Sequence, residues 1–112
     1  GEDPTGFIGQ YQAIAGMSIS PQLASALVAR LLEKPTAAQH VLEAIVVQWE
    51  HAKSYKDAQN IAGMLSAIST IPDALLFRME SAFAQNDQLF NSYAAPKFRA
   101  FVARVRPGRI VP

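Results

Sequence analysis

Apolar side chains recur along the chain at spacings of three and four residues, the repeat of an amphipathic helix. The pattern predicts helices over about 7–16, 20–33, 36–53, 54–68, 73–83 and 96–106, and the fifth could continue to Phe90. No segment of useful length alternates with a period of two, so strands are not expected. The connections are short, which favours antiparallel neighbours. The sequence therefore predicts an all-α fold: a bundle of five or six short helices, mostly antiparallel neighbours.

Capping residues set several of these boundaries. Ser20 is a favoured N-cap and Pro21 suits the first helical position. Pro35 ends the second helix, because the residue before a proline avoids the helical region. Thr36 followed by Gln39 has the pattern of a capping box for the third helix, and Ser54 with Asp57 resembles a second cap.

Length and composition limit the class of protein. The 112 residues suit one all-helical domain, or a fragment of a larger one, over 1–112. Half of the residues are apolar and 17% are charged, which excludes a disordered tail. There is no cysteine, so disulfides, thiolate catalysis and cysteine-ligated metals are excluded. No apolar run is long enough for a membrane span, and GEDPTG does not resemble a signal peptide, so a cytoplasmic protein is expected.

The net charge is only +1, but the charge is unevenly distributed. From Lys97 onward there are five basic residues and no acidic residue, whereas the rest of the chain carries five basic and nine acidic residues. This segment is a possible basic patch that could bind phosphate or an acidic partner. The alternative is an ordinary solvent-exposed helix and tail. Its arginines are Arg99, Arg104, Arg106 and Arg109.

No familiar catalytic motif is present: the chain has neither a nucleophile elbow nor a phosphate-binding loop. His40 and His51 lie eleven residues apart and would need Glu43 or Glu50 and a further ligand to hold a metal, so two surface histidines are the preferred interpretation. The acidic residues are dispersed. We therefore expect no catalytic residue, no metal and no cofactor.

The aromatic residues are interpreted first as core. Trp49, the single tryptophan, lies on the apolar stripe of its helix, with an interface hot spot as the alternative. Phe98 and Phe101 are likewise expected in the core and not as platforms for stacking nucleic-acid bases.

Two segments carry a resemblance to a known family. LVARLLEK (27–34) and VLEAIVVQWEHAKSYKDAQNIAGMLSAI (41–68) resemble the catalytic domain of Ras guanine-nucleotide exchange factors. The matching elements are Val28-Ala29, Val41-Leu42-Glu43, Glu50-His51 and Leu65-Ser66-Ala67-Ile68. Phe98-Arg99 and Ile110-Val111-Pro112 could correspond to later elements of the family, so the resemblance extends over about residues 27–112. The family's N-F-N element reads Asp57-Ala58-Gln59 here.

The resemblance implies a partner, a Ras-like small GTPase, and partner-binding residues at Arg30, His51, Asp57 and Gln59. An exchange factor binds the nucleotide-free GTPase more tightly than the nucleotide-bound form, and linkage then weakens nucleotide binding by the same factor. The family's helical hairpin would follow Pro112, so we expect no measurable exchange from these 112 residues alone.

Two other hypotheses remain open at this stage. The chain could be a helical adaptor or scaffold that binds another protein with no GTPase role. It could also bind nucleic acid through its basic last helix, although the weak overall charge makes nucleic acid an unfavoured partner.

Overall fold

The computed structural model describes residues 4–16, 19–90 and 94–108. Its elements are α1 (Pro4–Gly16), α2 (Pro21–Leu32), α3 (Pro35–Glu50), α4 (Tyr55–Met64), the 3₁₀ turn η1 (Leu65–Ala67), α5 (Asp73–Gln85), α6 (Asp87–Phe90) and α7 (Ala94–Val105). No strand occurs in these ranges, so the predicted all-α fold is confirmed. They hold seven α-helices instead of five or six, because the chain breaks at Asn86 and the short α6 is a separate helix.

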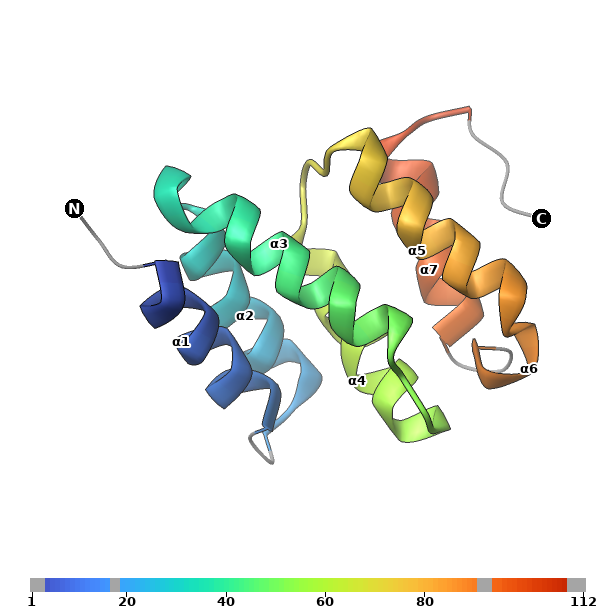
Figure 1. The fold of residues 1–112 in the computed structure, drawn as a ribbon, viewed down its shortest axis with the longest axis horizontal. Helices are drawn as coiled ribbons and strands as arrows, with labels where there is room; N and C mark the ends of the chain where they lie inside the picture. The colour runs from blue at the N-terminus through green and yellow to red at the C-terminus, as the bar shows by residue number, and fades with distance from the viewer. Residues whose placement is uncertain (1–3, 17–18, 91–93, 109–112) are drawn as a thin grey trace.

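The helices form two layers (Figure 1). α1, α3 and α5 pack side by side in the front layer, and α2, α4 and α7 pack side by side behind them. Neighbouring helices run in opposite directions, as the sequence predicted: α1–α2 and α3–α4 are helical hairpins, and α7 lies behind α5, to which α6 connects it, along the long axis of the molecule.

The serine caps predicted from the sequence are confirmed. The backbone N–H of Leu23 donates to Ser20 Oγ at 3.1 Å, and Pro21 occupies the first turn of α2. The backbone N–H of Asp57 likewise donates to Ser54 Oγ at 3.1 Å at the start of α4. Each bond satisfies a donor that the first turn of a helix would otherwise leave unpaired.

The predicted capping box at Thr36 is wrong. α3 begins one residue earlier, at Pro35, with Lys34 as an N-cap residue that makes no side-chain capping bond. The fixed φ of proline is already helical, so Pro35 starts the helix without help from Thr36.

Other boundaries also differ from the sequence expectation, and the first helix begins at Pro4, three residues before Phe7. The third helix ends at Glu50 and not near Lys53, and the fourth ends at Met64, where η1 replaces its last turn. The fifth ends at Gln85, and the last begins at Ala94, two residues before Pro96. Proline is tolerated in a first turn, so Pro96 does not mark the boundary. Met17 and Ser18, between the first two helices, and residues 109–112 lie outside the described residues.

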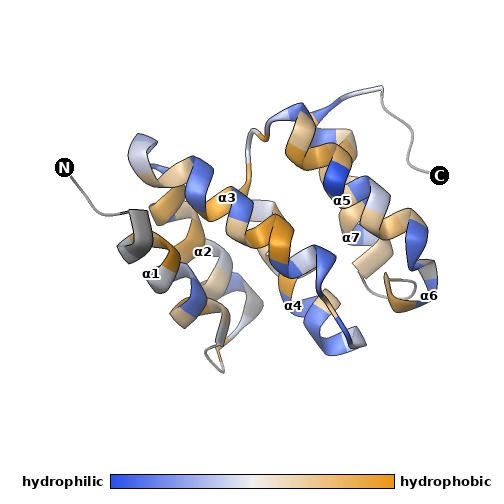
Figure 2. Cartoon of the chain, viewed as in Figure 1, coloured by the Kyte–Doolittle hydropathy of each residue, from blue (hydrophilic) through white to orange (hydrophobic). Residues whose placement is uncertain are grey.

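A single hydrophobic core lies between the two layers (Figure 2). Apolar residues of every helix turn inward, and the buried positions of the described residues include no charged side chain. The aromatic part of this core is built around Trp49, whose ring is stacked on Phe90 at 4.2 Å and on Phe98 at 5.0 Å between centroids. Trp49, Phe98 and Phe101 are thus core residues, as predicted.

The indole of Trp49 also makes a buried hydrogen bond. Its Nε1–H donates to the backbone carbonyl oxygen of Met79 in α5 at 3.0 Å. A buried donor without a partner would destabilise the fold, so this bond fixes both the depth and the orientation of the ring. Among the described residues, no helix combines the length and the hydrophobicity that crossing a membrane requires.

We predict that Trp49→Ala lowers the free energy of unfolding by about 3–5 kcal/mol, because it opens a cavity where α3, α5, α6 and α7 meet. Urea denaturation monitored by circular dichroism measures the loss. Trp49→Phe is the matched control: it keeps an aromatic ring, removes the bond to Met79 and should be clearly less destabilising. A loss below about 1 kcal/mol for the alanine variant would contradict the core role.

Candidate functional site

The turn between α3 and α4, residues 51–54, has a hollow on each side. The first hollow, about 240 Å³, lies against the ends of α1, α3 and α4. The second, about 380 Å³, lies against α3, α5 and α6. Ala52 lines both, so this turn forms the wall between them. We call the turn and its two hollows the turn site.

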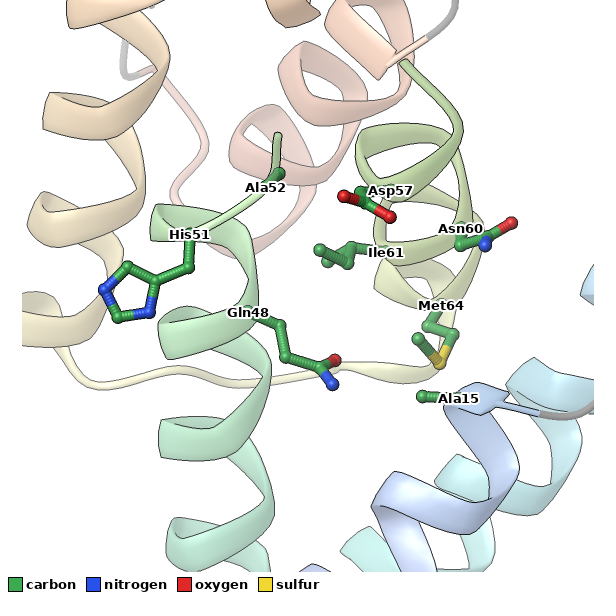
Figure 3. A pocket seen from close by; sticks show the side chains of 8 residues that line it. All are labelled: Ala15, Gln48, His51, Ala52, Asp57, Asn60, Ile61 and Met64. Carbon is green, nitrogen blue, oxygen red and sulfur yellow. The ribbon is translucent and has the colours of Figure 1, made fainter. Parts of the chain in front are cut away.

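The first hollow has an apolar base and a polar rim (Figure 3). Ile61 and Met64 of α4 point toward Gln48 of α3, and Ala15 at the end of α1 closes the hollow on a third side. The imidazole of His51 points the opposite way, toward α5. The hollow therefore offers contact surface and hydrogen-bonding groups, while its histidine faces away from its centre.

Asp57 shapes the turn itself. Its carboxylate Oδ2 accepts a hydrogen bond from the backbone N–H of Lys53 at 3.1 Å, while its own N–H is bonded to Ser54 Oγ. The carboxylate also lies in the first turn of α4, where a negative charge is favoured by the helix dipole. The capping role expected for Asp57 is thus present, and it holds residues 53 and 54 in a non-helical path.

Gln48 of α3 is hydrogen-bonded to the N-terminal helix α1. The buried hydroxyl of Tyr11 in α1 donates to Gln48 Oε1 across the junction of α1 and α3. Burial raises the pKa of Tyr11 far above its usual value, so the phenol stays protonated and remains a donor. This bond holds α1 against the turn site.

The second hollow carries the most exposed aromatic ring described in the structure. Phe77 of α5 lines this hollow and is 64% exposed. Tyr55 at the start of α4 is 57% exposed but lines neither hollow. Beside Phe77, Arg78 binds both carboxylate oxygens of Glu50, with Nε donating to Oε2 at 3.0 Å. This hydrogen bond holds the pKa of the Glu50 carboxyl below its usual value and raises the pKa of Arg78.

The residues implied by the exchange-factor resemblance are split by the structure. His51 and Asp57 both line the first hollow. Gln59 is exposed on α4 but does not line it, and Arg30 lines a separate hollow of about 620 Å³ between α1 and α2. The structure therefore brings two of the four residues to the turn site.

The possible basic patch is also divided. Arg104 donates to the carbonyl oxygens of Leu65 at 2.9 Å and Ile68 at 2.5 Å, and Arg106 donates to Ile71 O at 2.6 Å and Asp73 Oδ1 at 2.7 Å. Both guanidinium groups thus hold the segment that links α4 to α5. Arg99 instead lies over the ring of Phe83, 5.5 Å from its centroid. Arg109 lies outside the described residues.

The histidines do not share a site. His40 lies within α3 and is half-buried, whereas His51 is an exposed residue that caps the end of that helix. Over the described part of the chain, no group of three or more histidine or carboxylate side chains is close enough to hold a metal ion.

Phe77 and Tyr55 were not among the candidates from the sequence. The signal for Phe77 is its register: it lies on the opposite side of the helix from the apolar stripe of Leu75, Leu76, Met79 and Phe83. A large apolar residue on the polar face of an amphipathic helix is the pattern of an exposed contact residue.

No protein-family model matches the chain, and no curated protein and no solved structure matches it significantly.

The Glu50–Arg78 ion pair leads to a prediction of pH dependence. Because the folded-state pKa of Glu50 is lowered, the pair stabilises the fold above the unfolded-state pKa, and this contribution is lost as the pH falls through the lower folded-state value. Arg78→Met should therefore lower the melting temperature at pH 7, and the difference from the parent chain should shrink below about pH 4.

Thermal melts of the two chains across pH 2.5–7 test this expectation, with Arg99→Met as the control for loss of an arginine outside any carboxylate pair seen here. A difference between Arg78→Met and the parent that stays constant down to the lowest pH would show that the ion pair is not its origin.

Proposed function

We propose that the chain is a helical protein-interaction module that presents the turn site to a partner protein. The observation that carries the proposal is Phe77, a phenyl ring 64% exposed at the edge of a hollow and next to Arg78. Aromatic and arginine side chains around a concave surface are the usual composition of binding hot spots.

The stacked hairpins support the same proposal. Two layers of short helices place the ends of α1, α3 and α4 together, so residues far apart in sequence form one surface. The bonds made by Asp57 and by Tyr11 hold this surface in a single arrangement before any partner binds. A preorganised surface loses less conformational entropy on binding.

A narrower candidate is a Ras-like small GTPase as the partner. The observation that favours it is that Glu50, His51 and Asp57, all within the stretch that resembles the exchange-factor family, surround the turn site. The mechanism would be non-covalent binding, with no covalent bond made or broken. The helical surface would hold a switch segment of the GTPase, and preferential binding of the nucleotide-free form would weaken the affinity of the GTPase for its nucleotide.

Photo-cross-linking tests the general proposal. A benzophenone amino acid placed at position 77 should give a discrete covalent adduct with one protein in an extract of the cells that make this chain. The same group placed at Gln12, an exposed position of α1 outside the turn site, is the matched control and should give no such adduct. Equal adducts from both positions would contradict a partner at the turn site.

Calorimetric titration of purified Ras-like GTPases tests the narrower candidate. We expect at least one to bind more tightly without nucleotide than with it, by about tenfold or more. His51→Glu should weaken this binding and Gln12→Glu should not. The absence of any preference for the nucleotide-free form would overturn the GTPase assignment and leave the cross-linking test of the module unaffected.

A further inference from the structure

The two helical layers carry opposite charge. The front-layer helices α1, α3 and α5 contain four acidic residues and one basic residue, Arg78. The back-layer helices α2, α4 and α7 contain one acidic residue, Asp57, and five basic ones: Arg30, Lys56, Lys97, Arg99 and Arg104. The back-layer helices of this nearly neutral chain therefore carry a net positive charge, which favours acidic ligands near them.

A groove of about 310 Å³ runs along this back layer between α4 and α7. Small residues line it: Ala62 and Gly63 from α4 and Ala100 from α7. Because these side chains are short, the backbone of a ligand can approach the two helices closely. Leu65 and Phe101, both buried, provide an apolar base, and Ser66, whose hydroxyl is hydrogen-bonded to that of Ser25 in α2, completes the lining.

The charged residues of the groove are both cations. Lys97 and Arg104 line it from α7, seven residues and therefore about 10 Å apart along the helix axis. No acidic residue is among the described side chains that line it. The spacing matches two carboxylates at positions i and i+7 of a ligand helix, which lie on one face of that helix.

Arg104 is held in place before any ligand arrives. Its guanidinium donates to two backbone carbonyl oxygens, of Leu65 and Ile68, and lies 5.7 Å from the ring centroid of Phe101. The carbonyl oxygens are neutral, so they orient the positive charge without cancelling it. A fixed cation loses little side-chain entropy when it pairs with a carboxylate.

We propose that the α4–α7 groove binds an acidic amphipathic helix of a partner protein. The apolar stripe of that helix would pack on Gly63 and Ala100, above the buried Ala62, and its carboxylates would pair with Lys97 and Arg104. A helix satisfies its own backbone hydrogen bonds, which suits a groove that offers few backbone partners. This surface lies on the back layer and is separate from the turn site, so it adds a second contact to the proposed module.

Nucleic acid is the less favoured occupant of this face. Its binding relies on many phosphate contacts along a continuous basic stripe. Here the groove has two cations on an apolar base, Arg99 faces Phe83 on another side of α7, and Arg106 is paired with Asp73.

Fluorescence anisotropy with labelled synthetic peptides tests the proposal on the intact chain. The probe is a helical 15-residue peptide with glutamates at i and i+7 and leucines between them, and the matched peptide carries lysines in place of the glutamates. We expect the acidic peptide alone to bind, with an affinity that falls as salt rises. Lys97→Glu should weaken binding by about tenfold or more, and Ala100→Trp should fill the groove and abolish binding.

The control variant is Arg99→Glu, which makes the same charge change on the same helix outside the groove and should leave affinity within about twofold. Far-ultraviolet circular dichroism verifies that each variant is folded, including Ala100→Trp, which carries a second tryptophan. The proposal is overturned by equal loss from Lys97→Glu and Arg99→Glu, by equal binding of both peptides, or by no binding of the acidic peptide at about 1 mM. Tighter binding of a duplex oligonucleotide, or saturation of the groove by a second copy of the chain in sedimentation, would equally overturn it.

Discussion

The structure depends on the burial of one indole ring. Trp49 extends from α3 into the space between α5, α6 and α7, stacks on Phe90 and Phe98 and donates its N–H to Met79. α3 is also the helix against which α1 and α2 pack. Trp49 thus joins the N-terminal hairpins to the C-terminal aromatic cluster, and both hollows of the turn site lie at the end of the helix that carries it.

From this core the surface follows in steps. Stacked hairpins bring the helix ends together, and the bonds of Ser54 and Asp57 give the α3–α4 turn its shape. The linker from α4 to α5 is held by Arg104 of α7 and by Arg106, which follows the end of that helix, and Arg104 is thereby fixed at the rim of the back groove. The front-layer helices are rich in carboxylates and the back-layer helices are rich in cations. The proposed module thus has two chemically different contact surfaces, the turn site and the α4–α7 groove.

The sequence predicted what local periodicity controls. The all-α fold, the Ser20 and Ser54 caps and the burial of Trp49, Phe98 and Phe101 follow from spacing and capping chemistry within one helix. It failed at Thr36, because proline starts a helix without a side-chain cap, and at the break after Gln85. The candidate site was predicted only in part. Periodicity within one helix does not encode long-range packing. It therefore could not predict which backbone carbonyls Arg104 and Arg106 bind, or which helices enclose a groove.

The central claim is that the Trp49 cluster makes the stacked hairpins one cooperative unit. Urea unfolding followed on one sample by Trp49 fluorescence and by far-ultraviolet circular dichroism tests it most directly, because the first signal reports the aromatic cluster and the second reports all helices. The account predicts one transition with the same midpoint by both signals. Loss of the Trp49 signal at a clearly lower urea concentration than the loss of helix would contradict it.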